Sequence, residues 1–306
     1  MKISFVIAVY RNEESIKETA NRIKNLFSSD LKNYEYEIIF VDDGSDDGSL
    51  NEALAAREQD PSVKVISFTR NFGQMAAITA GLKKASGDAV INISADLQDP
   101  IELARDMIKQ WEGGSEIVIA YRQKRSDPFL SRVFSRLAYG ALRLSVPQLP
   151  KGGFDFVLID RKPLDIFNSV EYRNRFFQGD LLWAGYRMSF IPYERLRREF
   201  GVSQYNFTKK LKNFLDAFLD SSFLPIRFMS FFGIITTLLG ILYGLSVVYV
   251  WLQGGTPFEG WAPIVILLLV IGGAIMLMLG IIGEYVWRIN DEVRKRPNYV
   301  VRDEFL

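Results

Sequence analysis

Acidic and amide side chains follow two apolar runs of the chain, in positions where a ligand can bind. Asp43 comes soon after the run 36–41, and Asp96 and Gln98 come soon after the run 89–93. A carboxylate at the end of a strand can accept hydrogen bonds from a ribose or from the N–H of a base. Asp96 and Gln98 are two residues apart, so in an extended segment they project on the same side. Together they offer oxygen ligands to a metal ion that also holds a diphosphate.

Both groups also have a purely structural interpretation, which the sequence leaves open. Asp46 or Asp47 fits the N-cap of a helix that follows the first group. Asp99 and Pro100 fit the N-cap and the first position of another helix. Two acidic strand ends in one chain favour ligand binding more than either does alone.

The chain has neither cysteine nor histidine. The lack of cysteine excludes disulfides, iron–sulfur clusters and thiolate zinc sites, and the lack of histidine removes the commonest general base. Any metal must therefore be hard and oxygen-bound, Mg²⁺ or Mn²⁺ in type. Acid–base chemistry falls to carboxylates, lysine or tyrosine. The net charge of +1 gives no support for a nucleic-acid partner.

The elements that position these groups alternate between short apolar runs and amphipathic stretches. The runs are rich in Ile and Val without strict alternation, which is typical of parallel strands buried on both faces. Repeated strand–helix units predict a doubly wound, mostly parallel α/β sheet that binds ligands at the carboxyl ends of its strands. The predicted strands are 3–9, 36–41, 63–68, 89–93 and 116–120, and the predicted helices include 14–27, 73–84 and 100–111.

Two long uncharged runs predict a pair of transmembrane helices, at 228–252 and 261–283. Each is long enough to cross a hydrocarbon core of roughly 30 Å. Basic residues flank the two runs, at Arg227 before the first and at Arg288 and Arg294 after the second, and the turn between the runs has none. The positive-inside rule then predicts a multi-pass protein of the inner (plasma) membrane, with the α/β domain and both termini cytosolic.

Residues 206–222 predict an amphipathic helix directly before the hairpin. Its apolar side chains share one face, while Lys209, Lys210 and Asp216 lie off that face. We interpret it as a helix at the membrane interface, and an ordinary helix that faces the core is the alternative. The chain then divides into an α/β domain at 1–205, the interfacial helix at 206–222, a transmembrane hairpin at 223–290 and a cytosolic basic tail at 291–306.

Seven short segments carry a family pattern. They are residues 6–14, 41–49, 70–74, 95–100, 153–161, 175–176 and 198–205. In these segments the chain resembles the family 2 glycosyltransferases, which have a GT-A fold. More narrowly, it resembles the polyprenyl-phosphate glycosyltransferases, the group that includes dolichol-phosphate mannose synthase and the bactoprenol glucosyltransferases. The resemblance extends through the two apolar runs and covers nearly the whole chain.

The resemblance implies an enzyme that transfers a sugar from a UDP-sugar to a polyprenyl (undecaprenyl) phosphate at the cytosolic membrane face. The transfer inverts the anomeric configuration, and glucose is the favoured sugar. It implies Mg²⁺ or Mn²⁺ as cofactor and the lipid bilayer as a partner, and it leaves the oligomeric state open, a homo-oligomer included. By position, it assigns the nucleotide to Ala8, Tyr10, Glu14 and Asp43, the metal to Asp96 and Gln98, catalysis to Asp96 and Asp155, and the acceptor phosphate to Arg122, Arg132, Arg136, Arg198 and Ser203.

Two positions depart from the family pattern. Ser94 stands where the family usually has an aspartate, which removes one carboxylate from the metal site but leaves a hydroxyl. Gln204 stands where the family often has a lysine, and Lys209 or Lys210 are substitutes for that contact with the acceptor.

The acceptor phosphate needs no strong general base. The second pKa of a phosphate monoester lies near ~6, so at cytosolic pH the group is largely a dianion. Asp155 therefore either orients the site or removes a proton. Arginine suits bidentate phosphate binding, and seven arginines flank the predicted acceptor side: Arg122, Arg132, Arg136, Arg143, Arg195, Arg197 and Arg198.

Two other functions stay open at this point. A processive polysaccharide synthase on the same fold needs a membrane channel and a Gln-x-x-Arg-Trp motif. Two apolar helices are too few to enclose a polymer, and the motif does not occur in the chain. A catalytically inactive membrane scaffold is suggested by Ser94. Turnover of a nucleotide-sugar with a polyprenyl phosphate distinguishes both from the main interpretation.

Overall fold

The computed structural model describes residues 1–123, 140, 142–143, 146–150, 153–170, 175–196, 224–254 and 262–306. The chain forms two compact units, of which one comprises Met1–Ser221 with Pro297–Leu306 and the other comprises Ser222–Arg296. The chain thus leaves the first unit, forms the second, and returns to the first with its C-terminal residues. The predicted interfacial helix at 206–222 lies outside the described residues.

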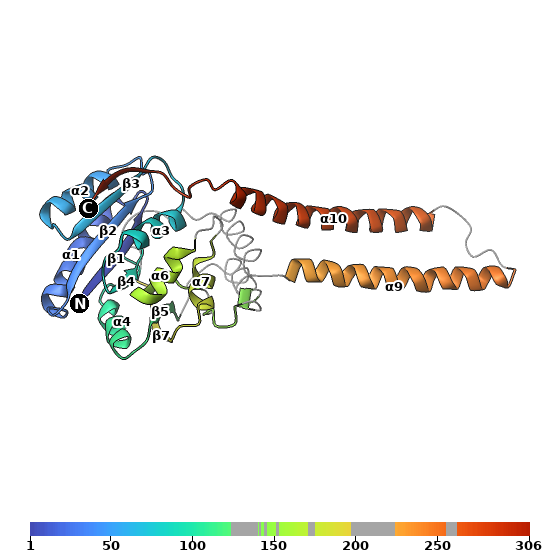
Figure 1. Ribbon diagram of the computed structural model, residues 1–306, viewed down its shortest axis with the longest axis horizontal. Helices are drawn as coiled ribbons and strands as arrows, with labels where there is room; N and C mark the ends of the chain where they lie inside the picture. Colours follow the sequence, from blue (N-terminus) through green and yellow to red (C-terminus); the bar gives the residue numbers. More distant parts are fainter. Residues whose placement is uncertain are drawn as a thin grey trace. The chain divides into compact units, whose positions relative to one another are not determined.

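A mixed sheet runs through the first unit (Figure 1). In the described part of the chain its strands lie in the order β7-β5-β6-β4-β1-β2-β3-β8. The neighbours β4, β1, β2 and β3 are parallel, whereas β6 is antiparallel to β4 and β5, and β8 is antiparallel to β3. The strands are β1 (Lys2–Val9), β2 (Glu35–Asp42), β3 (Val63–Phe68), β4 (Ala89–Asn92), β5 (Ile117–Arg122), β6 (Phe156–Asp160), β7 (Met188–Tyr193) and β8 (Val301–Phe305).

Helices pack on both faces of this sheet because its strands are apolar on both faces. Along β1, Phe5 and Ile7 belong to one buried cluster, and Val6 belongs to the other. The first cluster includes residues of α1 (Glu13–Ser29), α2 (Ser49–Gln59) and α4 (Leu103–Glu112), and the second includes residues of α3 (Gln74–Lys84), α6 (Arg161–Ser169) and α7 (Phe177–Trp183). The predicted α/β class, with a doubly wound and mostly parallel sheet, is confirmed.

One predicted helix start is wrong. The Asp99–Pro100 pair does not begin α4, which starts at Leu103 after a turn closed by a 3.1 Å hydrogen bond from Leu103 N–H to Pro100 O. The Asp99 carboxylate is buried, and it accepts hydrogen bonds from Ser94 and Tyr193 instead of capping the helix. Asp99 therefore does not act as a helix cap, because Ser94 and Tyr193 bind its carboxylate.

The second unit consists of α9 (Leu224–Leu252) and α10 (Ala262–Val293) in the described part of the chain. Ile226–Leu252 and Val270–Val293 have mean hydropathies of 2.1 and 1.8. By length and composition, both helices can cross a membrane. They match the two predicted spans, although α10 continues beyond the predicted end of the hairpin at residue 290.

The C-terminal residues form a strand, which differs from the predicted basic tail at 291–306. The strand β8 pairs with β3, with Phe305 opposite Val65 and Val301 opposite Phe68. Val301 and Phe305 also pack against the two buried clusters. The strand therefore covers an edge of the sheet that would otherwise present unpaired backbone groups.

Candidate active site

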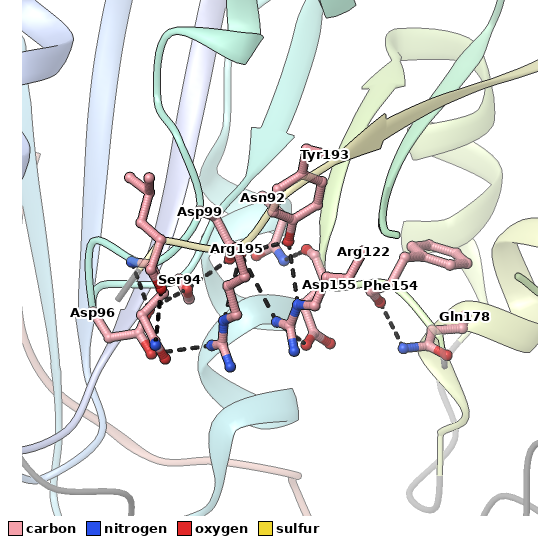
Figure 2. Close-up of polar contacts among 12 residues, drawn as sticks. Asn92, Ser94, Asp96, Asp99, Arg122, Phe154, Asp155, Gln178, Tyr193 and Arg195 are labelled. Carbon is pink, nitrogen blue, oxygen red and sulfur yellow. Dashed lines mark hydrogen bonds and ion pairs between the residues drawn. The ribbon is translucent and has the colours of Figure 1, made fainter. Parts of the chain in front are cut away.

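The loop after β4 gathers the polar side chains that the sequence singles out (Figure 2). Ser94 Oγ lies 2.8 Å from Asp96 Oδ1 and 2.8 Å from Asp99 Oδ2. Because a hydroxyl has one proton, Ser94 donates to one carboxylate at a time. Leu97 has a φ of 54°, a left-handed conformation that is strained for a residue with a side chain. Such strain persists where surrounding contacts hold the turn, as they do here.

Two hydrogen bonds join this loop to the segment after β7. Leu196 N–H donates to Gln98 O at 2.9 Å, and Gln98 Nε2 donates to Leu196 O at 3.3 Å. The side-chain bond uses the amide nitrogen, so the amide oxygen is the atom with which Gln98 can bind a metal. The connection also brings Arg195 Nη2 to 3.2 Å from Asp96 Oδ2. The sequence predicted Arg195 on the acceptor side, and the structure pairs it with a predicted metal ligand.

Arg122 and Tyr193 connect Asp99 with Asp155. Arg122 Nη2 lies 3.8 Å from Asp99 Oδ1 and 3.5 Å from Asp155 Oδ2, and the Tyr193 hydroxyl donates to Asp99. Burial lowers the pKa of Arg122, but Asp99, Asp155 and Tyr193 together raise it by more, so the net shift is upward. Burial, and after it Asp99, raises the pKa of Tyr193. Asp155 therefore faces a permanently charged guanidinium, and Asp99 faces a hydroxyl that keeps its proton.

Two amide side chains fix the backbone that carries Asp155. Asn92 Nδ2 donates to Asp155 O at 2.7 Å, and Gln178 Nε2 donates to Phe154 O at 2.5 Å. Asn92 belongs to β4 and Gln178 to α7, so separate elements hold consecutive carbonyl groups (Figure 2). No sequence pattern predicts these contacts, because amide donors and backbone acceptors occur throughout any chain.

The residues assigned to the nucleotide lie near the carboxyl ends of β1 and β2, where Ala8 and Tyr10 are half-buried, Glu14 is exposed and Asp43 is buried. The loops after these strands are joined to each other. Arg11 Nε and Nη2 donate to the two oxygens of Asp46, at 2.6 Å each, and Gly48 N–H donates to Glu13 Oε2 at 3.0 Å. Asp46 therefore holds a loop, and the N-cap of α2 is Gly48.

Asp43 binds the backbone of a third loop. Its carboxylate oxygens accept hydrogen bonds from Phe72 N–H at 2.6 Å and from Gly73 N–H at 2.9 Å. Burial raises the pKa of Asp43 to about 6, against the opposing effect of these two donors. Any contact between Asp43 and a nucleoside is thus additional to two bonds within the protein.

Of the residues assigned to the acceptor phosphate, the structure describes Arg122. The other four, Arg132, Arg136, Arg198 and Ser203, lie outside the described residues, as do Arg197 and Gln204. Arg122 is largely buried, and it lies between two carboxylates at the carboxyl end of β5.

The atoms around Asp96 fit a hard divalent cation. Asp96, Gln98 and Ser94 supply oxygen atoms, the ligand type that Mg²⁺ and Mn²⁺ prefer. Among the described residues, no three acidic side chains come together as a closed metal cage. The protein thus offers an open, partial set of ligands, which is typical of metal sites that also bind phosphate. The guanidinium of Arg195 already places a positive charge against Asp96.

Known sequences resemble this chain over its full length. The model of glycosyl transferase family 2 matches residues 4–178. The uncharacterised glycosyltransferase YkcC of Bacillus subtilis (strain 168) is 37% identical, over 100% of this chain and 94% of its own length. The SfII prophage-derived bactoprenol glucosyl transferase of Shigella flexneri is 36% identical, over 99% of this chain and 98% of its own length.

Solved structures share the fold. Glucosyl-3-phosphoglycerate synthase from Mycobacterium tuberculosis, in complex with Mn²⁺, UDP and phosphoglyceric acid, has a TM-score of 0.52 at 18% identity, over 71% of this chain and 76% of its own. Mannosyltransferase PcManGT from Pyrobaculum calidifontis has a TM-score of 0.52 at 16% identity, over 71% of this chain and 63% of its own. The sheet, the acidic loop at its carboxyl edge and the full-length similarity agree: the chain is a glycosyltransferase with a GT-A fold and belongs to glycosyl transferase family 2.

Proposed function

We propose that this enzyme transfers glucose, with inversion, from UDP-glucose to the phosphate of undecaprenyl phosphate. The observation that carries the proposal is the 36% identity to the SfII prophage-derived bactoprenol glucosyl transferase over 99% of this chain. That similarity includes both apolar helices. A polyprenyl chain stays in the bilayer, because each buried CH₂ contributes roughly 0.8 kcal/mol. A lipid acceptor thus explains why a glycosyltransferase carries two helices that can cross a membrane.

The loop after β4 supports departure of the UDP group. A Mg²⁺ or Mn²⁺ ion held by Asp96 and Gln98 would supply positive charge to the diphosphate. The M. tuberculosis synthase of the same fold was solved with Mn²⁺ and UDP. Arg195 lies 3.2 Å from Asp96 Oδ2, so its guanidinium is within reach of the same diphosphate. Ser94 orients Asp96 through a hydrogen bond between their side chains.

The acceptor phosphate acts as the nucleophile. As a dianion it needs no proton removed before it attacks the anomeric carbon from the side opposite UDP, which inverts the configuration. Asp155 lies 3.5 Å from Arg122, and an ion pair with arginine opposes proton uptake by a carboxylate. We therefore assign Asp155 to the orientation of Arg122 toward the acceptor phosphate rather than to general-base catalysis. Arg132, Arg136, Arg198 and Ser203 complete this proposed phosphate site.

The donor nucleotide occupies the other side of the site in this proposal. Ala8 and Tyr10 at the end of β1, Glu14 in α1 and Asp43 after β2 bind the uridine. One feature of the structure supports this assignment. β2 and β4 lie on either side of β1, so the order of the strands reverses at β1. Ligands of open α/β sheets bind at the carboxyl ends of the strands at such a reversal.

The proposed orientation places the catalytic unit in the cytosol. Both ends of the second unit connect to the first unit, so the ends of the hairpin share one side of the membrane if both helices span it. Arg288 and Arg294 favour the cytosolic side. Single cysteines at Thr256→Cys and Asn298→Cys should label from opposite sides of sealed vesicles. Labelling of both from one side would contradict a spanning hairpin.

A product analysis tests the proposed reaction. Purified full-length protein receives undecaprenyl phosphate and a panel of nucleotide-sugars, and the lipid product is analysed by mass. We expect one hexose on the lipid with UDP-glucose, and no product with Asp96→Asn. A lipid-linked polymer would indicate a processive synthase. A failure of every nucleotide-sugar to turn over would indicate an inactive scaffold.

A further inference from the structure

The C-terminal strand contacts the loop that supports Asp43. β8 lies along β3, whose carboxyl end continues into residues 69–73. Thr69 N–H donates to Val300 O at 3.1 Å, and Arg302 Nη2 donates to Thr69 O at 3.0 Å. Both backbone polar groups of Thr69 are thus bonded to the segment that follows α10. The first residue of the loop is held in place by the end of the chain.

Three aromatic rings extend this contact to Phe72. Tyr299 stacks on Phe68, with ring centroids 4.9 Å apart and planes 12° from parallel. Phe68 is buried, and it meets Phe72 edge to face at 5.8 Å. The guanidinium of Arg70 lies over the Phe72 ring, 4.3 Å from its centroid. The position of Phe72 therefore depends on Phe68, and Phe68 is supported by a ring from the C-terminal segment.

The turn at Phe72 in turn holds Asp43. Phe72 N–H and Gly73 N–H donate to the two oxygens of the Asp43 carboxylate. Gly44, the next residue, has a φ of 66°, and a Cβ at this position would lie 2.4 Å from the backbone carbon of Arg70. The loop after β2 and the loop after β3 are therefore in contact backbone to backbone. A displacement of residues 70–73 moves the Asp43 carboxylate.

We propose that residues 299–302 complete the donor site, with Tyr299 as a positioning residue that acts on Asp43 through Phe68 and Phe72. This inference rests on the proposed assignment of Asp43 to the nucleotide. This segment follows α10 in the chain. The donor site is therefore complete only after both helices of the hairpin have been synthesised and the C-terminal residues have joined the catalytic unit. The membrane hairpin and the nucleotide site are thereby linked through a strand that carries no catalytic residue.

Calorimetry of UDP binding to full-length Tyr299→Ala tests the proposal, together with steady-state kinetics. Loss of one aromatic pair should weaken UDP binding about three- to tenfold. The KM for UDP-glucose should rise by the same factor, while kcat and the KM for undecaprenyl phosphate stay unchanged. Tyr299→Phe keeps the ring and should restore the affinity. Wild-type UDP affinity in Tyr299→Ala, even with a lowered unfolding temperature, would make Tyr299 a structural residue only and overturn the proposal.

Glu304→Gln is the matched control in the same strand. It removes the partner of Lys84, whose Nζ atom lies 2.7 Å from Glu304 Oε2, and leaves the stack of Tyr299 on Phe68 in place. This variant should bind UDP as the wild type does. A loss of affinity equal to that in Tyr299→Ala would show that any weakening of β8 lowers UDP binding, and would contradict the specific role of Tyr299.

Asp43→Asn separates the two proposals. Unchanged UDP binding there refutes the role of Asp43 itself, whereas weakened binding there with normal binding in Tyr299→Ala refutes only the present inference.

Discussion

Two clusters of charged side chains lie at opposite ends of the parallel strands. At the amino ends, Glu37 in β2 is 1% exposed and meets Lys2 Nζ at 2.8 Å and Lys64 Nζ at 2.9 Å. Ser4 Oγ and Ser86 N–H both donate to its other oxygen, at 2.6 Å. These partners come from β1, from β3 and from the residues just before β4. Glu37 is therefore enclosed by the sheet itself.

At the carboxyl ends, the carboxylates take their positive partners from outside the four strands β1 to β4. Arg195 follows β7 and lies 3.2 Å from Asp96 Oδ2, and Arg122 in β5 lies 3.5 Å from Asp155 Oδ2. The side chain of Asp155 is 50% exposed. An arginine side chain can leave such a carboxylate without breaking a strand. From this difference we expect similar ion pairs to stabilise the fold where the sheet encloses them, and to permit ligand binding where loops leave them accessible.

The largest expected effect is at the open cluster. Asp96→Ala should lower the rate of sugar transfer by about 10³-fold, because it removes the one carboxylate of the proposed metal site. EDTA should have the same effect on the wild type. The initial rate of lipid glycosylation measures both, with the unfolding temperature as a control for folding. Full activity in EDTA would contradict a metal role for Asp96.

The enclosed cluster should respond in stability rather than in rate. Glu37→Gln leaves Lys2 and Lys64 beside a neutral buried side chain, which should lower the free energy of unfolding by about 3 kcal/mol. The kcat of the folded protein should not change, since Glu37 lies at the other end of the strands. Denaturant unfolding and a transfer assay on the same sample measure the two quantities. A large fall in kcat with normal stability would reverse the proposed division between the clusters.

Low pH should reduce the contribution of Glu37 to the free energy of unfolding. Burial raises its pKa, but hydrogen bonds from Lys2, Ser4, Ser86 and Lys64 lower it by more, so the net pKa is far below the usual value. Its stabilising effect is fully present above the unfolded-state pKa of ~4.3 and is lost as the pH falls toward the folded-state pKa. The difference in unfolding free energy between wild type and Glu37→Gln should therefore be smaller at pH 3 than at pH 7. An equal difference at both values would contradict this origin.

A smaller effect is expected where Arg195 pairs with Asp96. Arg195→Ala removes a competing cation, so Mn²⁺ should bind up to about fivefold more tightly in the absence of nucleotide, given the modest strength of a partly exposed pair. Transfer should nevertheless slow, because the arginine no longer reaches the diphosphate. Arg187→Ala is the control, since Arg187 pairs with Glu116 and is 76% exposed. Weaker Mn²⁺ binding in Arg195→Ala would make the arginine a support of the metal site instead of a competitor.

The smallest effect is expected at Ser94. Ser94→Asp adds a carboxylate beside Asp96, and should lower the Mn²⁺ concentration needed for the half-maximal rate by a few-fold. In the wild type, the hydroxyl of Ser94 lies 2.8 Å from Asp96 Oδ1, so position 94 is suitable for a metal ligand. An unchanged metal titration would mean that position 94 does not face the ion.

The strands of the parallel core could be predicted because the signal is local. Val63–Phe68 is found as predicted, and the predicted strand 89–93 is found at Ala89–Asn92. Strands buried on both faces appear as apolar runs in the sequence itself. β8 could not be predicted, because charged residues occupy its middle and a solvated tail has the same composition. Its pairing depends on the open edge of β3, which lies more than two hundred residues earlier.

The candidate site divides in the same way. Asp96, Asp155 and Arg122 could be found from the sequence, and the structure brings them to one edge of the sheet. Gln98 was also found from the sequence, and it is bonded to Leu196 in the segment after β7. The role of Asp99 was missed because its partner Tyr193 lies 94 residues away, while the adjacent proline is typical of a helix start. Arg195 was predicted on the acceptor side, and its contact with Asp96 was missed. Asn92 and Gln178 were not predicted at all. These contacts with Asp96 and with the backbone at 154–155 arise only in the folded chain.

The contrast between the clusters is tested most directly by Mn²⁺ binding. Electron paramagnetic resonance can follow a Mn²⁺ titration of the full-length protein in the presence of UDP, for wild type, Asp96→Asn and Glu37→Gln. We expect Asp96→Asn to lose Mn²⁺ binding, and Glu37→Gln to keep the wild-type affinity despite its lower stability. Wild-type Mn²⁺ affinity in Asp96→Asn would contradict the assignment of the metal, and with it the proposed active site.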